Sequence, residues 1–237
     1  MSGRLILWDI DGTLVRAGEI GAGVFDLALE KVLGVRPPSR VVMSGRTDPQ
    51  IAREYLELMG HDPEEHLVGV LAHLEHELAA AAQQLTATGS VCPGVEEVLA
   101  DLGKDSRIAQ SVLTGNIAPN AVVKLAAFGL DRYLDLGAGA YGSDEADRRL
   151  LVPVALARQA SLRGRHFSAE ETWIVGDSPL DLDCARAGGA NCALVATGRF
   201  TFAELEPLGA DAVLEDLSDT ESVLALLAGD LWDWPRR

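Results

Sequence analysis

The stretch LILWDIDGTL, residues 5–14, decides how the rest of this chain is interpreted. Four apolar residues in a row are followed by Asp9, one apolar residue, a second carboxylate at Asp11, and then glycine and threonine. A short apolar run bounded by turn residues predicts a strand that is buried on both faces, as in a parallel sheet. Because ligands of open α/β sheets gather outside the carboxyl ends of the strands, the two acids are expected where a ligand binds.

The spacing of Asp9 and Asp11 predicts a bound cation. Side chains two residues apart in an extended chain point to the same side, so both carboxylates face one small volume. Like charges held that close repel each other strongly unless a proton or a cation lies between them. The sequence therefore indicates a cation site at the end of the first strand.

Composition limits the classes of function. The chain has 237 residues, of which 48% are hydrophobic and 24% charged, as expected for one large domain or a domain with an insertion. The net charge of −16 argues against nucleic-acid partners and acidic membranes. Cys92, Cys184 and Cys192 form no CxxC pair, which predicts a reduced chain with buried thiols. We expect a cytoplasmic protein, because no signal peptide or membrane-length apolar run is present.

The order of elements predicts an α/β fold with an inserted cap. Residues 15–87 have apolar side chains at helical spacing and no convincing strand, with helices expected at about 17–33, from 47 and at about 63–85. From residue 88 onward, strands and helices alternate, which predicts a Rossmann-like parallel sheet with helices on both faces. The core would comprise residues 1–14 and 88–237, and residues 15–87 would form an all-helical cap.

Several details of the core are also predicted. The strands are expected at residues 108–113, 172–175, 191–196 and 212–214, with a weaker candidate at 134–137. A helix is expected at 147–162, where Pro153 must lie in the first turn or cause a kink. Trp232 and Trp234 are expected to pack the tail against the core.

Polar residues at two further strand ends complete a candidate site. Thr114 ends one predicted strand and Asp177 follows another, so both are expected at the same edge as Asp9 and Asp11. A hydroxyl and helix N-terminal amides suit a phosphoryl group. A cluster of acids suits a hard cation, and Mg²⁺ is the usual cation where phosphates are handled.

These motifs together resemble the haloacid dehalogenase superfamily, and specifically its phosphoglycolate-phosphatase-like branch. The motifs are DIDGT at residues 9–13, LTGN at 113–116 and GDSPLD at 176–181, and the similarity covers nearly the whole chain, including the cap. The resemblance implies that Asp9 is the nucleophile that forms an aspartyl-phosphate. Asp11 would be the general acid that protonates the leaving oxygen and then the base that activates water.

The resemblance also implies the remaining site residues. Asp9, the backbone carbonyl of Ile10 and Asp177 would hold Mg²⁺, with Asp11 beside them in the same metal site. Thr114 and the amides of Gly115 and Asn116 would bind phosphate oxygens, and Asp181 would orient the site. The substrate would be a small phosphorylated metabolite, and the protein a monomer or homodimer.

Asp11 favours one reaction over its rivals. Haloacid dehalogenases resemble this chain but have no second aspartate there, because expelling halide needs no proton whereas expelling an alkoxide does. The resemblance therefore implies a Mg²⁺-dependent phosphatase of small phosphate monoesters. A dehalogenase-type hydrolase that uses Asp9, or a non-catalytic small-molecule-binding protein, are the alternatives.

Two assignments stay open. In this family a lysine offsets the negative charge of the nucleophile and the phosphate. Two residues could have that role here, Lys124 and Arg148, and Lys124 is slightly favoured. Arg46 lies in the glycine-flanked stretch SGRTD, residues 44–48, which either swings over the site to read the leaving group or is an ordinary helix start.

Overall fold

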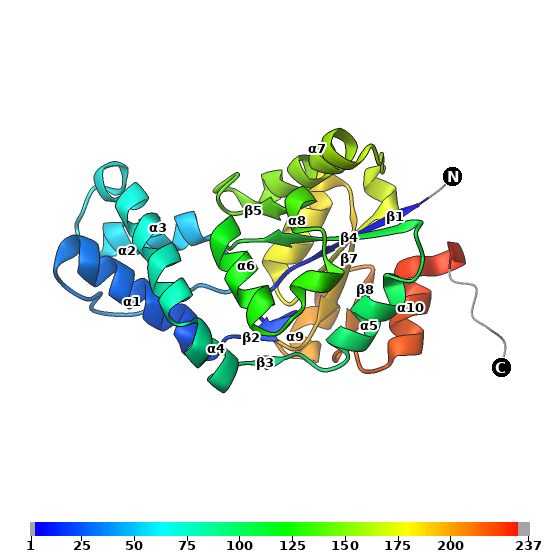
Figure 1. Ribbon diagram of the computed structural model, residues 1–237, viewed down its shortest axis with the longest axis horizontal. Helices are drawn as coiled ribbons and strands as arrows, with labels where there is room; N and C mark the ends of the chain where they lie inside the picture. The colour runs from blue at the N-terminus through cyan, green and yellow to red at the C-terminus, as the bar shows by residue number, and fades with distance from the viewer. Residues whose placement is uncertain (1–2, 232–237) are drawn as a thin grey trace.

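A six-stranded parallel sheet forms the centre of the molecule. The computed structural model describes residues 3–231, and the strand order is β5-β4-β1-β6-β7-β8 (Figure 1). The strands are β1 (Arg4–Trp8), β4 (Ile108–Thr114), β5 (Ala140–Tyr141), β6 (Thr172–Gly176), β7 (Asn191–Val195) and β8 (Ala212–Leu214). All neighbours in this sheet are parallel, as the α/β pattern predicted. The opening stretch supplies β1, which lies between β4 and β6.

Alternate residues of β1 pack against opposite helix layers. Ile6 and Trp8 lie in a buried cluster with residues of α5 (Val95–Leu102), α6 (Ala118–Ala127) and α10 (Thr220–Ala228). Leu5 and Leu7 lie in a second cluster with α7 (Leu151–Arg163) and α8 (Pro179–Gly188). The short helix α9 (Phe202–Leu205) adds Leu205 to the second cluster. This arrangement explains why the run is apolar without alternation, since both faces of the strand are covered.

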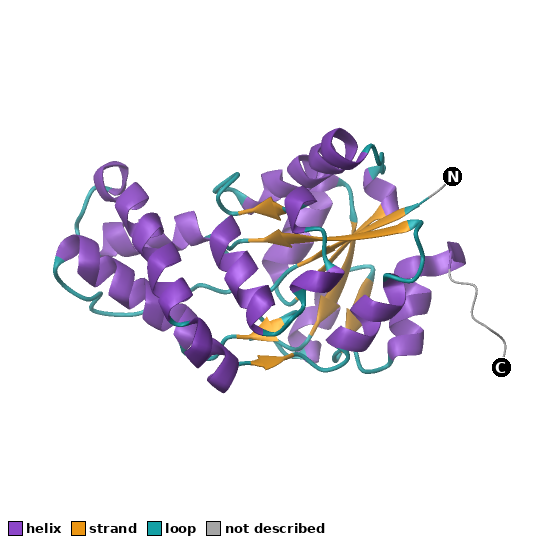
Figure 2. Cartoon of the chain, viewed as in Figure 1, coloured by secondary structure: helices purple, strands orange, loops and turns teal. Residues whose placement is uncertain are grey.

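The cap is a helical unit with its own apolar cluster. It contains α1 (Ile20–Leu33), α2 (Asp48–Leu58), α3 (Pro63–Ala80) and α4 (Ala82–Thr88), which lie together at one end of the molecule (Figures 1 and 2). Phe25, Tyr55 and Leu74 are buried among residues of α1, α2 and α3. α1 and α2 both pack against α3, and this third cluster extends to Ile117 and to residues of α6 in the core.

The structure differs from the sequence prediction where elements are short. Residues 15–87 were expected to contain no strand, yet β2 (Val15–Arg16) pairs antiparallel with β3 (Ser90–Val91). Two residues are too few for an alternating pattern, and the partner strand lies beyond the whole cap. The predicted helix at 63–85 is divided at Ala81 into α3 and α4.

Two core elements also differ. Residues 134–137 are not a strand; 3-10 turns occupy Asp131–Tyr133 and Leu136–Ala138, and the edge strand follows at Ala140–Tyr141. Pro153 lies in the first turn of α7, one of the two predicted placements. The three cysteines are buried and unpaired, and none of the described helices has the length and apolar character to cross a membrane. Trp232 and Trp234 lie outside the described residues.

Candidate active site

The ends of three adjacent strands bring the candidate residues to one edge of the sheet. Asp9 follows β1, Thr114 is the last residue of β4, and Asp177 follows β6. Because β4 and β6 flank β1 in parallel register, these positions are neighbours, and the Asp9 amide donates to the Val175 carbonyl at 2.9 Å. A cavity of about 330 Å³ opens here, lined by core residues and by the cap helices α1, α2 and α3.

A cluster of buried acids forms part of this edge. One carboxylate oxygen from each of Asp9, Asp177 and Asp181 lies within 4.8 Å of the others, and all three side chains are buried. Asp181 lies in the first turn of α8, where it caps the helix by accepting from the Ser178 amide at 3.0 Å and hydroxyl at 2.6 Å. Of the predicted metal site, Asp9 and Asp177 are in this cluster, and the third acid is Asp181, which was predicted to orient the site.

Burial and mutual repulsion favour the protonated forms of these acids. Burial, and then the nearby carboxylates of Asp181 and Asp11, raise the pKa of Asp9 to about 7, although the Arg148 cation opposes this. Burial and the carboxylates of Asp181 and Asp9 raise the pKa of Asp177 to about 8. Ionised carboxylates this close require a counter-charge. Their all-oxygen donor set suits a hard divalent cation of the Mg²⁺ type.

Arg148 provides a fixed positive charge inside this cluster. Its guanidinium lies 3.0 Å from Asp9 Oδ1, contacts Asp181, and donates to the Gly45 carbonyl at 2.9 Å. Burial alone would lower the pKa of Arg148, but Asp181 and Asp9 reverse this effect and the pKa is raised. A short 3-10 turn at Arg148–Leu150, just before α7, presents the side chain to the site.

Lys124 contacts the other aspartate. Its ammonium donates to Asp11 Oδ2 at 2.6 Å and to Asn116 Oδ1 at 2.7 Å. The side-chain Nδ2 of Asn116 donates in turn to Asp11 Oδ2 at 2.8 Å and to Thr114 Oγ1 at 2.9 Å. The two cations that the sequence left as alternatives thus both lie in the site, Arg148 against Asp9 and Lys124 against Asp11. The Asp11 side chain is 43% exposed and the Asp9 side chain 5%, so Asp11 is the more accessible acid.

Two glycines make room for Asp177. Gly12 has φ +84°, and a Cβ atom there would lie 2.6 Å from Asp177 Oδ2. A Cβ atom on Gly198, in the loop after β7, would overlap the same oxygen. The sequence prediction did not include Gly198. Its only local signal is its place shortly after a strand end at the same edge of the sheet.

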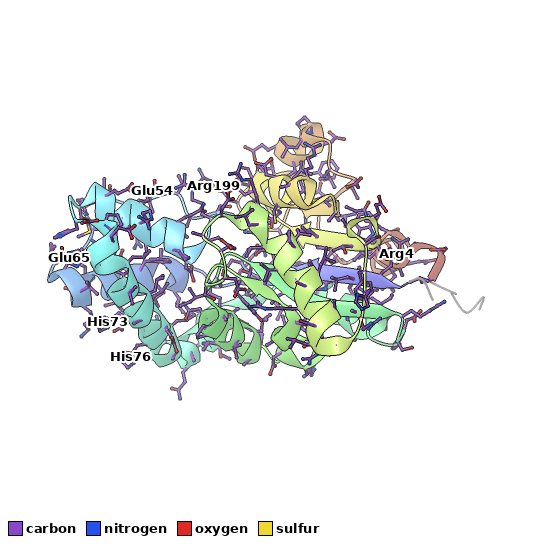
Figure 3. All side chains as sticks on the ribbon, turned by 90° about the horizontal axis from the view of Figure 1, so that it is seen from above. Arg4, Glu54, Glu65, His73, His76 and Arg199 are labelled. Atoms are coloured by element: carbon purple, nitrogen blue, oxygen red, sulfur yellow. The ribbon has the colours of Figure 1, made fainter. Side chains whose placement is uncertain are left out.

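The cap loop and one core loop add charged residues to the cavity. Arg46 lines the cavity and is ion-paired with Glu54 of α2, and Arg199 lines it from the loop after β7. Figure 3 shows Arg199 on the part of the core nearest the cap. Asp48, the first residue of α2, also lines the cavity. The sequence prediction treated Asp48 as part of a helix start and missed Arg199, because an isolated exposed arginine gives no local signal.

Comparisons with known proteins identify the family and the fold. The model of the haloacid dehalogenase-like hydrolase family matches residues 6–186. The chain is 30% identical over 225 residues to the plasmid phosphoglycolate phosphatase of Cupriavidus necator, covering 94% of this chain and 92% of the relative. A hydrolase from Pseudomonas syringae has a similar structure, with TM-score 0.70, 20% identity and coverage of 95% and 99% of the two chains. CbbY from Rhodobacter sphaeroides, in complex with phosphate, gives TM-score 0.66, 19% identity and coverage of 92% and 96%.

Proposed function

The chain belongs to the haloacid dehalogenase-like hydrolases, and on that premise we propose that it is a Mg²⁺-dependent phosphatase of small phosphate monoesters. One observation favours this activity over the alternative activities. A second, accessible carboxylate at Asp11 is held beside the buried Asp9 by Lys124 and Asn116. An ester oxygen needs a proton to leave as an alcohol, and Asp11 is placed to supply it.

The reaction proceeds in two displacements. A carboxylate oxygen of Asp9 attacks phosphorus and the bond from phosphorus to the alcohol oxygen breaks, while Asp11 gives its proton to that oxygen. Water then attacks the aspartyl-phosphate as Asp11 takes up a proton, which releases inorganic phosphate and restores Asp9. Thr114 and the amides of Gly115 and Asn116 hold the phosphate oxygens. The cations of Lys124 and Arg148 offset the negative charge around the transferred group.

The donor set fits Mg²⁺. Asp9 and Asp177 would hold it, and Asp181, which contacts Arg148 and accepts from Ser178, would fix the orientation of the neighbouring groups. The backbone carbonyl of Ile10, the third predicted ligand, instead accepts from the amides of Leu14 at 2.9 Å and Val15 at 3.0 Å, so the structure does not support it as a ligand. When bound, the cation supplies charge neutralisation for the acids and for the phosphoryl oxygens.

The organic part of the substrate would occupy the cavity under the cap. The Cupriavidus necator relative is a phosphoglycolate phosphatase, and we propose a small phosphorylated metabolite of that kind for this chain. Arg46 and Arg199 both line the cavity, and we propose that Arg46 contacts the leaving group. A dehalogenase-type reaction would leave Asp11 and its two partners without a role.

Three variants test this proposal with p-nitrophenyl phosphate and glycerol phosphate in Mg²⁺. We expect Asp9→Asn to abolish turnover, and Asp11→Asn to lose about 10²–10⁴-fold on the alkyl ester. The loss in Asp11→Asn should be smaller on p-nitrophenyl phosphate, because nitrophenolate leaves without a proton. Asp183→Asn, on the exposed face of α8, is the matched control. Turnover that survives in Asp9→Asn would contradict the mechanism.

A further inference from the structure

Asp48 of the cap holds the turn that follows Thr114 at two points. Its backbone amide donates to the Gly115 carbonyl at 2.7 Å. One of its carboxylate oxygens accepts from the Ile117 amide at 2.8 Å. These two bonds lie on either side of Asn116, and the Asp48 side chain is buried. The first residue of α2 in the cap is therefore joined by two hydrogen bonds to the loop that follows β4 of the core.

The backbone next to Asp48 is packed against the same loop without spare room. A Cβ atom on Gly115 would overlap the carbonyl oxygen of Arg46. The Thr47 hydroxyl donates to the Ala146 carbonyl at 2.7 Å while also capping α2. The cap segment and the core loop are thus packed closely together, and the hydrogen bond that the Ile117 amide donates to this segment goes to Asp48.

The turn that Asp48 holds carries the groups that the proposed function requires. The amides of Gly115 and Asn116 are the proposed phosphate donors, and the Asn116 side chain bonds to Asp11 and Lys124. Backbone amides stabilise a bound anion best when the protein already holds their N–H groups in the direction of the anion site. We infer that Asp48 is a positioning residue for phosphate binding, which it reaches from the cap by clamping residues 115–117. This inference rests on the proposed function, because it assigns phosphate to that turn.

Two substitutions at position 48 separate the clamp from simple stability. Asp48→Asn retains an oxygen that accepts from the Ile117 amide, whereas Asp48→Ala removes it. Asp62→Ala is the control: Asp62 is an exposed aspartate that also begins a cap helix, accepting from the Glu64 amide at 2.9 Å.

The constants to measure are KM and kcat for p-nitrophenyl phosphate, the inhibition constant of inorganic phosphate, and the shift of Tm that phosphate produces. We expect Asp48→Ala to raise KM and the phosphate inhibition constant together by about tenfold or more, with a smaller change in kcat. Asp48→Asn should stay within about threefold of the parent protein. Asp62→Ala should lower Tm and leave KM and the phosphate inhibition constant unchanged.

Distinct results would overturn this inference. An Asp48→Ala protein with a lowered Tm but unchanged phosphate constants would show a merely structural role. Equal losses in Asp48→Asn and Asp48→Ala would show that the hydrogen bond is not what matters. If the parent protein hydrolyses no ester, the proposed function fails while the phosphate-induced shift of Tm still tests Asp48. If the parent protein neither hydrolyses an ester nor shows such a shift, both the proposed function and this inference fail.

Discussion

Arg148 and Lys124 face different acids, and burial makes their removal unequal. Arg148 contacts Asp9 and Asp181, whose side chains are 5% and 0% exposed, whereas the side chain of Asp11, the partner of Lys124, is 43% exposed. Removing one partner of a buried ion pair leaves the other charge without compensation, but a partly exposed acid regains water.

We therefore predict that Arg148→Ala loses about 3–5 kcal/mol of unfolding free energy. Lys124→Ala should lose much less stability but most of its turnover, because Asp11 loses its cation and Asn116 a partner. Urea unfolding and kcat, measured on the same preparations, check both. Arg149→Ala, an exposed neighbour paired with Asp147, is the control and should change neither. An inactive but stable Arg148→Ala beside an active Lys124→Ala would reverse the assignment.

At the scale of single residues, the sequence predicts the position of those side chains that directly follow a strand. Asp9, Thr114 and Asp177 each follow an apolar run, so their shared edge could be expected from local pattern alone. Asp181 was expected to orient the site, but its direct membership of the acid cluster depends on how α8 leaves β6 and on the Arg148 contact, which local sequence does not show. Asp48 was hidden for the same reason, since its partners lie on another part of the chain.

Helix α1 offers a steric test of where the leaving group lies. Gly21 and Gly23 are two residues apart, and a Cβ atom at either would meet nothing within 4 Å. Gly21 lines the cavity, while Gly23 is not among the cavity-lining residues. Leucine is favoured over glycine in a helix by roughly 0.5–1 kcal/mol, so neither substitution should unfold the cap.

We predict that Gly21→Leu reduces kcat/KM for bulky esters such as naphthyl phosphate by about tenfold or more, since roughly 1.4 kcal/mol of lost binding suffices. A small ester such as methyl phosphate should lose less, because it does not extend to α1. Gly23→Leu should behave as the parent protein on both. Equal effects of the two substitutions, or no effect of Gly21→Leu on any ester, would place the leaving group elsewhere.

The elements of the fold were predictable in proportion to their length and burial. β1, β4 and β6 are apolar runs covered on both faces, and α1 to α3 have helical spacing, so local patterns suffice. β2, β3 and β5 have two residues each, and each is a strand only because a distant partner offers hydrogen bonds. Local sequence contains no record of such partners.

Across the whole molecule, stability should depend jointly on pH and on the divalent cation. Without a cation, the pKa of Asp9 is about 7 and that of Asp177 about 8, both above the ordinary value of 3.8. The folded protein then binds protons more tightly than the unfolded chain. The stability that these acids contribute is fully present below about pH 4 and is lost as pH rises through 7 to 8. Mg²⁺ binds the ionised forms and so competes with those protons.

We predict that Tm of the EDTA-treated protein falls between pH 6 and pH 8.5, and that millimolar Mg²⁺ raises Tm more at pH 8.5 than at pH 6. The excess should be at least about 2–4 °C, which corresponds to roughly 1 kcal/mol for a chain of this size. Titration in two buffers of different ionisation enthalpy should show protons released as Mg²⁺ binds. Asp177→Asn removes one of the two titrating acids and should lose most of the excess, whereas the exposed Asp183→Asn should keep it. A rise in Tm that is equal at both pH values would mean that these carboxylates do not exchange protons for the cation.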